Sequence, residues 1–349
     1  MEEKIRVLVV DDSFLMRRII SDIINSDPEL EVVGRAKDGA EAVDKVLALA
    51  PDVVTLDVNL PVKDGIGALE DIMKKKPTRV IMLSAYTRAG ASATMRALEL
   101  GAVDFIAKPS GEISLGLDKL KNDIIIKIKL VAKVNLDRYI ESLQPASLTL
   151  VKEEVKPALI KKLVIIGAST GGPRAIMDII QDIQLDLPAA FLIIQHMPKG
   201  FTLSFAERIA WHSGIRAKEA EADDILAPGR IFIAPAGFHM ILEAHRQQVR
   251  LRLNQDPMVN FVRPAIDVTM FSAAEIFGKD IIGVILTGMG RDGLEGARRV
   301  KEKGGRIIVQ DEETSVIWGM PKSIIKAGLA DEVLPIYKIS EAITKYIYS

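Results

Sequence analysis

The sequence contains no cysteine among its 349 residues. This excludes disulfide bonds, thiol nucleophiles and thiolate metal sites, and it suits a reducing cytoplasm. Only four histidines are present, so histidine chemistry has few candidates. The net charge is -1, and no run of basic residues is longer than Lys74 to Lys76. The chain therefore lacks the positive face that nucleic acid binding requires.

Long apolar segments are also missing. The N-terminus, MEEKIRVLVVDD, is charged and lacks the basic region and long apolar core of a signal peptide. Apolar runs such as Ile124 to Ile126 are far too short to span a membrane. The composition, 48% hydrophobic and 27% charged, is that of a globular protein, and the length indicates about two domains.

The first 130 residues alternate between strand-like and helix-like segments five times. The expected strands are apolar and β-branched, and they cover residues 5–10, 31–36, 53–56, 80–83 and 102–107. Helical spacing fills the intervals, for example over 13–25 and 39–50. This alternation predicts an α/β domain with a parallel sheet covered by helices on both faces, a flavodoxin-like (βα)5 arrangement.

Charged and hydroxyl side chains stand where these expected strands end: Asp11, Asp12, Asp57, Ser84 and Lys108. In parallel sheets ligands bind beyond the carboxyl ends of the strands. Three carboxylates there repel one another, and Mg²⁺ offsets that repulsion through oxygen ligands. With a lysine and a hydroxyl nearby, the set suits phosphoryl transfer onto a carboxylate. Taken singly, Asp11 and Asp12 can be helix caps and Lys108 a solvated lysine.

These residues lie in motifs that resemble the receiver domain of two-component response regulators: VVDDS at 9–13, LDVNLPVKDG at 56–65, LSAYT at 83–87 and AKPS at 107–110. The resemblance implies Asp57 as phosphoacceptor. It also implies Mg²⁺ held by Asp12, Asp57 and the backbone carbonyl of Asn59, with Asp11 assisting. Ser84 and Lys108 would contact the phosphoryl group, and Phe105 would be the switch aromatic.

We expect the receiver domain to cover residues 1–125. Residues 126–160 would form a helical extension and an interdomain linker, because helical spacing fades after Ile140 and Pro145 and Pro157 follow. A second domain would cover 161–349.

The second domain opens on KLVIIGASTGGP at 162–173, an apolar run that ends in small residues before a helical pattern. Ser169 therefore lies in a turn between a strand and a helix. The run also fits G-x-S-x-G, in which a tight turn exposes a nucleophilic serine. A purely structural turn is the alternative. A phosphate-binding loop is disfavoured, because neither G-x-x-x-x-G-K-[ST] nor G-x-G-x-x-G is present.

His196 and Asp292 also follow expected strands, at 190–195 and 281–286. At a shared sheet edge, Ser169 can attack a carbonyl, His196 can accept and return the proton, and Asp292 can fix the imidazole tautomer. Activity should then fall as acid protonates His196. The N–H of Thr170 can stabilise the oxyanion, with a second donor from the glycine-rich loop 288–290. Segments 230–234, 239–243 and 249–253 are expected to form a small antiparallel excursion in a mainly parallel, doubly wound α/β domain.

Each member of this set has a structural alternative. A histidine after a strand is often structural, and Asp292 can cap the helix that begins near Leu294. We expect core packing for His212, a pocket-lining place for His239 and a solvated loop for His245. The chain order Ser, His, Asp differs from the Ser, Asp, His of α/β-hydrolases, so a triad here would be convergent.

The second half resembles the catalytic domain of chemotaxis protein-glutamate methylesterases. The matching motifs are IIGASTGGP at 165–173, IIQHMP at 193–198, IFIAPAGFHM at 231–240, RPAIDVTMFSAA at 263–274, LTGMGRDG at 286–293 and GMPKSI at 319–324. The resemblance implies the triad Ser169, His196 and Asp292, with the Met289 backbone contributing to the oxyanion site. Ester hydrolysis itself would need no cofactor.

The implied substrates are glutamate γ-methyl esters on the cytoplasmic domains of methyl-accepting chemotaxis receptors, with release of methanol and with deamidation of receptor glutamines. The chemotaxis histidine kinase would phosphorylate Asp57 and relieve inhibition by the receiver domain. The rival function is a non-catalytic, phosphorylation-dependent signalling adaptor. No nucleic acid and no membrane insertion are expected.

Overall fold

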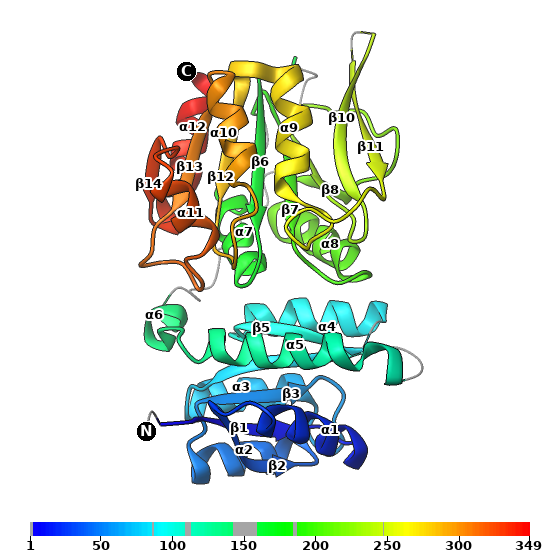
Figure 1. The fold of residues 1–349 in the computed structure, drawn as a ribbon, viewed down its shortest axis with the longest axis vertical. Coiled ribbons are helices and arrows are strands. Elements are labelled where there is room, and N and C mark those ends of the chain that lie inside the picture. The colour runs from blue at the N-terminus through cyan, green and yellow to red at the C-terminus, as the bar shows by residue number, and fades with distance from the viewer. Residues whose placement is uncertain (1–2, 86, 109–112, 142–158, 184–186, 247) are drawn as a thin grey trace. The chain divides into compact units, whose positions relative to one another are not determined.

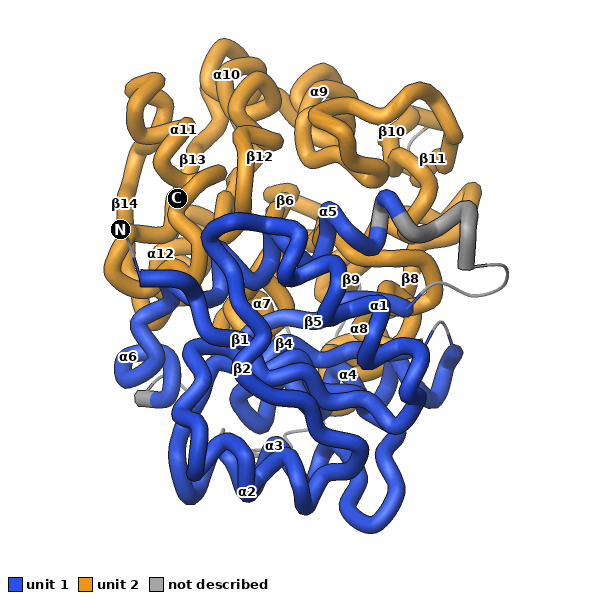
Figure 2. The backbone as a smooth tube through the Cα atoms, turned by 60° about the horizontal axis from the view of Figure 1, so that its bottom comes forward, with its two compact units in different colours: residues 1–145 blue, residues 146–349 orange. Residues whose placement is uncertain are grey.

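The computed structural model describes residues 3–85, 87–108, 113–141, 159–183, 187–246 and 248–349. The chain divides into two compact units, residues 1–145 and 146–349 (Figure 2). Within the described ranges, no helix is both long enough and apolar enough to cross a bilayer.

The first unit is a five-stranded parallel sheet in the order β2-β1-β3-β4-β5. The strands are β1 (Ile5–Val10), β2 (Leu30–Ala36), β3 (Val53–Asp57), β4 (Arg79–Ala85) and β5 (Asp104–Lys108). The helices are α1 (Phe14–Asn25), α2 (Gly39–Leu49), α3 (Gly65–Lys75), α4 (Arg88–Glu99), α5 (Ile113–Val131) and α6 (Leu136–Glu141). The predicted fold class and its five strands are confirmed.

Local sequence explains where the first four helices begin. Ser13, Asp38, Asp64 and Thr87 each accept a hydrogen bond from a backbone N–H two or three residues into the helix. These side chains satisfy donors that have no partner within the helix. The strand β3, which lies between α2 and α3 in the chain, is buried along its whole length. Caps and buried strands together place the strand ends at one edge of the sheet.

The second unit is a seven-stranded sheet in the order β14-β13-β12-β6-β7-β9-β8, and all its pairings are parallel. The strands are β6 (Lys162–Ala168), β7 (Ala189–Gln195), β8 (Arg216–Glu219), β9 (Arg230–Ile233), β12 (Ile281–Ile285), β13 (Arg306–Gln310) and β14 (Glu332–Leu334). Beside it stands an antiparallel hairpin of β10 (His239–His245) and β11 (Gln248–Asn254) (Figure 1).

Helices cover both faces of this sheet. They are α7 (Gly172–Ile180), α8 (Phe201–Ser213), α9 (Ile266–Phe277), α10 (Leu294–Glu302), α11 (Met320–Lys326) and α12 (Ile336–Tyr348), with a short 3-10 turn η1 (Gly278–Asp280) before β12. One core packs α9, α10, α11 and the hairpin against the strands, with side chains such as Ile266, Met270 and Val300 fully buried. The predicted doubly wound architecture is confirmed.

The antiparallel excursion is smaller than predicted. The segment predicted at 230–234 forms β9, which joins the main sheet parallel to β7. Its Ile231, Phe232 and Ile233 are buried, because β8 continues the sheet on its other side. The short strands β8 and β14 were not predicted, since neither has a clear apolar run. Most of the predicted linker, residues 142–158, lies outside the described residues.

Candidate active site and phosphorylation site

Ser169 follows the last residue of β6, directly before the turn into α7. Its backbone N–H donates to Thr287 O at 3.0 Å, and its carbonyl accepts from Gly172 N at 2.8 Å. The residue is half-buried. The position of Ser169 at the edge of the sheet is thus fixed by hydrogen bonds to both its backbone N–H and its backbone carbonyl.

Gln195 links the serine turn to the histidine. Its Nε2 donates to the carbonyls of Ser169 at 2.8 Å and His196 at 3.1 Å. The His196 N–H donates to Ala168 O at 3.0 Å. The Gln195 side chain is itself buried, so its amide is shielded from water and its hydrogen bonds hold the two carbonyls in place. Sequence reasoning missed Gln195, although it immediately precedes His196.

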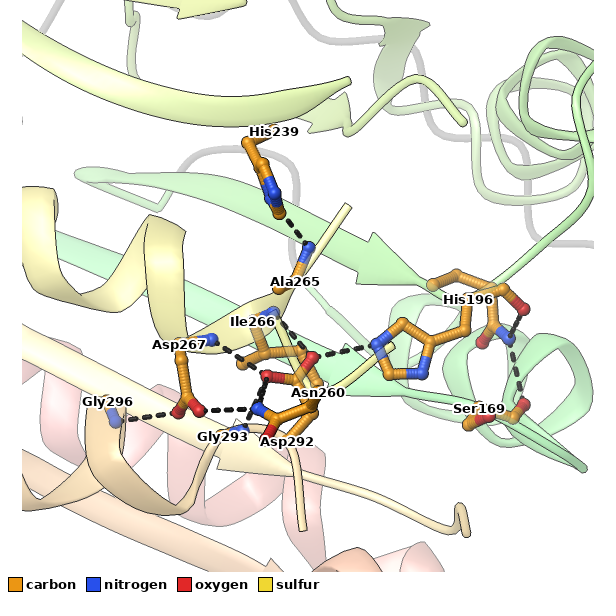
Figure 3. A network of polar contacts seen from close by, with 11 residues as sticks. Ser169, His196, His239, Asn260, Ala265, Ile266, Asp267, Asp292, Gly293 and Gly296 are labelled. Atoms are coloured by element: carbon orange, nitrogen blue, oxygen red, sulfur yellow. Dashed lines mark hydrogen bonds and ion pairs between the residues drawn. The ribbon is translucent and has the colours of Figure 1, made fainter. Parts of the chain in front are cut away.

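His196 and Asp292 form a close pair. Nε2 of the ring lies 2.8 Å from Asp292 Oδ2, and the side chains are 10% and 2% exposed. Since a carboxylate only accepts, Nε2 carries the proton and Nδ1 is the basic nitrogen of the neutral ring. In Figure 3 the ring lies between Asp292 and Ser169. No hydrogen bond within the described residues joins the Ser169 hydroxyl to His196.

Asp292 is held by several donors. Besides His196, Oδ2 accepts from Ile266 N at 2.7 Å, and Oδ1 accepts from Asp267 N at 3.2 Å and Gly293 N at 3.1 Å. Burial alone would raise the pKa of Asp292, but the hydrogen bond and charge of His196 and the backbone N–H groups outweigh it and hold that pKa below its usual value. The carboxylate is therefore ionised and aimed at the imidazole.

The predicted oxyanion donors are available. Among the described residues, neither the Thr170 N–H nor the Met289 N–H donates a hydrogen bond. Gly288 brings the Met289 loop against the serine: a Cβ on Gly288 would lie 2.8 Å from Ser169 Cβ and 2.5 Å from Met320 Sδ. Only glycine permits this approach.

Two further polar residues, both missed by sequence reasoning, adjoin the pair. Asn260 Nδ2 donates to Asp267 Oδ2 at 2.8 Å and to Asp292 Oδ1 at 3.0 Å. Burial, with repulsion from Asp292, raises the pKa of Asp267 to about 6. The signal for Asp267 was a carboxylate in the otherwise apolar first turn of α9. Asn260 gave no periodic signal, because it lies in a loop.

The remaining histidines have structural places. His239 is buried and its ring bonds Pro257 O at 3.1 Å and Ala265 N at 3.2 Å, so it packs rather than lining a pocket. His212 is half-buried, with its ring edge-on to Trp211. His245 is exposed as predicted, but it ends β10 instead of lying in a loop, and Arg250 Nη2 lies 2.8 Å from its Nδ1.

The first unit gathers its predicted site residues at one sheet edge. Lys108 Nζ lies 2.6 Å from Asp57 Oδ2 and 2.7 Å from Asp11 Oδ2. Burial raises the pKa of Asp57, Lys108 opposes that rise, and Asp11 adds to it. Burial would lower the pKa of Lys108, but Asp57 and Asp11 outweigh it and raise that pKa. The lysine is thus held in its protonated form beside the two carboxyl groups.

The acidic cluster fits a divalent cation. Ligand oxygens of Asp11, Asp12 and Asp57 all lie within 4.8 Å of one another. Among the described residues, Ser84 Oγ is buried without a hydrogen-bond partner, as expected of a hydroxyl that awaits a phosphoryl oxygen. Asn59 N donates to Asp57 Oδ1 at 3.4 Å, which places Asn59 beside the cluster. Hard oxygen donors of this number suit Mg²⁺.

The predicted switch aromatic, Phe105, is buried. Lys127 of α5 donates to its carbonyl at 2.6 Å and lies 5.3 Å from the ring centroid. Tyr86, Pro109 and Ser110 of the receiver motifs lie outside the described residues.

Both halves match family models. Residues 7–117 match the response regulator receiver domain, and residues 164–343 match the CheB methylesterase domain. The catalytic domain of Thermotoga maritima CheB methylesterase, known from a crystal structure, is 48% identical and superposes with a TM-score of 0.52, covering 54% of this chain and 97% of that one. These matches define the class: a receiver domain joined to a methylesterase catalytic domain.

Full-length relatives share this arrangement. A protein-glutamate methylesterase/protein-glutamine glutaminase from Pyrococcus horikoshii is 48% identical over 99% of this chain and 95% of its own length. One of the same name from Thermotoga maritima is 48% identical over 98% of each chain. The chain therefore belongs to the CheB methylesterase family, in its form with a receiver domain.

Proposed function

We propose that this protein is a phosphorylation-activated serine hydrolase that removes methyl groups from glutamate γ-methyl esters on chemoreceptor proteins. The observation that carries the proposal is the His196–Asp292 pair, in which Nε2 and Oδ2 are 2.8 Å apart. Gln195, the residue before His196, connects this pair to the serine turn by donating to the Ser169 carbonyl. The relatives' name, protein-glutamate methylesterase/protein-glutamine glutaminase, supports this substrate.

The reaction follows acyl-transfer chemistry. His196 Nδ1 removes the proton from Ser169 Oγ, which attacks the γ-carbonyl carbon of the ester. The protonated ring returns that proton to the methoxy oxygen, and methanol leaves. Water, deprotonated by the same nitrogen, then attacks the acyl-serine and releases glutamate and Ser169. Asp292, bonded to Nε2, stabilises the imidazolium in both steps.

The oxyanion would be bound by the N–H groups of Thr170 and Met289, which have no partner in the described part of the chain. The same attack on a glutamine side chain would release ammonia in place of methanol. Deamidation of receptor glutamines is therefore proposed as a second reaction of this site, as the relatives' glutaminase name indicates.

In the receiver domain, Asp57 would accept a phosphoryl group from a chemotaxis histidine kinase. Asp11, Asp12, Asp57 and the Asn59 carbonyl would hold Mg²⁺, which would neutralise charge on the phosphoryl oxygens. Lys108 and Ser84 would bind those oxygens, and Phe105 would act as switch aromatic. We assign residues 1–125 to this domain, 126–160 to the helical extension and linker, and 161–349 to the methylesterase. The reaction would take place in the cytoplasm.

The test is methanol release from methylated receptor, with and without Mg²⁺ and a small phosphodonor. Wild type should release methanol, and Ser169→Ala should release none while keeping its thermal unfolding midpoint. If Ser169→Ala matches wild type, or if neither releases methanol while the protein still binds receptor, the hydrolase proposal fails and the signalling adaptor replaces it.

A further inference from the structure

Asn260 is the side chain that joins the triad carboxylate to a second buried carboxylate. A single amide nitrogen bonds Asp292 Oδ1 at 3.0 Å and Asp267 Oδ2 at 2.8 Å (Figure 3). Both acceptors are carboxylate oxygens, so the nitrogen and not the oxygen of the amide must face them. Each of its two hydrogens then serves one carboxylate.

The polar cluster around Asn260 contains three ionisable side chains. Its titratable members within the described residues are Asp267 from α9, Asp292 from the loop before α10 and His196 from the end of β7. Arg291, next to Asp292 in the chain, is exposed. Two buried carboxylates that lack a cation between them repel each other, and a shared donor offsets that repulsion.

The backbone at Asn260 is adapted to this contact. Its φ is 54°, in the left-handed region that asparagine tolerates better than most residues. Phe261 follows with φ 64° and is 97% exposed, so the amide points to Asp292 while the next side chain points to solvent. Two consecutive left-handed residues strain the backbone, and this strained turn directs the Asn260 amide to the Asp292 carboxylate.

We propose that Asn260 is a positioning residue of the catalytic triad, whose amide holds the Asp292 carboxylate on the His196 ring and separates it from Asp267. The inference rests on the proposed function. Asn260 touches neither the ester nor Ser169; it acts through Asp292, which must remain ionised and fixed while His196 gains and loses its proton.

The first experiment removes the amide and keeps the backbone. In Asn260→Gly the left-handed conformation is retained without strain, so only the side-chain bonds are lost. A hydrogen bond to a charged group is involved, and we expect kcat for methanol release to fall by about 10- to 100-fold with KM unchanged. Asn254→Ala is the matched control: it removes an amide whose oxygen accepts one exposed loop hydrogen bond, from Asp256 N.

The second variant, Asn260→Asp, keeps size and backbone preference but replaces the donor by a carboxylate. At pH 8 three carboxylates would then meet, so its kcat should lie below that of Asn260→Gly. A backbone or packing role predicts the opposite order, because aspartate resembles asparagine more closely than glycine does. Wild-type kcat in Asn260→Gly, or Asn260→Asp at or above Asn260→Gly, would overturn the proposal.

A readout independent of activity separates this inference from the proposed function. In protein with ¹⁵N-labelled histidine, the Nε2–H of His196 should give a downfield proton signal in wild type, assigned by its loss in His196→Gln. The signal should shift upfield or disappear in Asn260→Gly and persist in Asn254→Ala. An unchanged signal in Asn260→Gly refutes the inference; a wild type that releases no methanol refutes the proposed function instead.

Discussion

Gly288 shows how closely single atoms determine the geometry of the proposed active site. The hydrogen on its Cα occupies the place where any other residue would put a Cβ, 2.8 Å from Ser169 Cβ. Neither partner can move freely, because Ser169 N is bonded to Thr287 O, and Gly288 N to Ile317 O at 2.9 Å. The serine side chain and the loop that carries the proposed oxyanion donor Met289 are therefore positioned by mutual contact.

We expect Gly288→Ala to lower kcat for methanol release by about 100-fold, since a displacement of about 1 Å can cost that much. Gly328→Ala is the control. Its φ of 69° adds a left-handed backbone strain that Gly288→Ala does not carry, so this control is the more strained of the two, but its Cβ would meet no atom within 4 Å. Activity assays well below the unfolding temperature should show normal turnover in Gly328→Ala. Equal kcat in the two variants would contradict the steric explanation.

Asp178, in α7, predicts a pH dependence of stability. Burial, partly opposed by Arg174, raises its pKa from the usual 3.8 to about 6. The folded protein thus holds a proton that the unfolded chain has already lost between these values, so stability falls as pH rises through that window. The side chain is 17% exposed, and the loss amounts to about 3 kcal/mol at most.

The effect of Asp178→Asn on the stability of the folded protein should therefore be more favourable at high pH than at low pH. The free energy of unfolding of the variant relative to wild type should increase from pH 4 to pH 6.5 and stay constant above it. Denaturant titrations at four pH values measure this. A difference independent of pH would show that Asp178 stays ionised in the folded protein.

At the scale of elements, α9 and α10 begin without side-chain caps of their own, at Ala265 and Gly293. In each helix, backbone N–H groups of the first turn donate instead to a carboxylate that lies at the start of the other helix. Asp292, just before α10, accepts from Ile266 N and Asp267 N of α9. Asp267 of α9 accepts from Gly296 N of α10 at 2.7 Å. Asp292 therefore caps α9 and not α10, the helix near Leu294 that the structural alternative assigned to it, and the same carboxylate also bonds His196.

This reciprocal capping predicts that Asp292→Ala destabilises the second unit by about 1–3 kcal/mol, because buried N–H groups lose their acceptor. Ser169→Ala should change stability by less than about 0.5 kcal/mol, although both variants should be inactive. Thermal and denaturant unfolding provide the measurement. Equal stabilities would mean that the helix ends do not depend on the carboxylate.

Elements with a strong local signal were predictable from sequence. Apolar runs located β1, β3, β6, β7 and β12 within one or two residues, and with them the positions of Asp57, Ser169, His196 and Asp292. The strand β9 was assigned to the wrong sheet, since four residues carry no information on their partner. Asn260 could not be predicted, because its contacts arise from a left-handed turn and from residues 7 and 32 positions away.

At the scale of the whole molecule, two sheets of the same class present their proposed functional groups at the ends of parallel strands. In the first, the groups are acidic with one lysine; in the second they are a serine, a histidine and a carboxylate. Sequence predicted this division, because each strand end carried chemically distinctive residues. It could not predict how Lys108 is shared between Asp11 and Asp57, which depends on side-chain geometry.

The division predicts separable effects of substitution. Asp57→Asn removes the proposed phosphoacceptor and should leave basal methanol release unchanged while abolishing stimulation by a phosphodonor with Mg²⁺. Asp44→Asn, an exposed aspartate of α2, is the control and should remain fully stimulated. Stimulation that persists in Asp57→Asn would place the phosphoryl group elsewhere.

The capping of α9 by Asp292 has a consequence for mutational screens. In a library scored only by cellular abundance, substitutions of Ser169 should be silent, whereas those of Asp292 should be depleted together with substitutions of ordinary core residues. In a library scored by turnover, both positions should be intolerant. Comparison of the two screens would separate residues needed only for turnover, such as Ser169, from residues needed for both turnover and folding, such as Asp292.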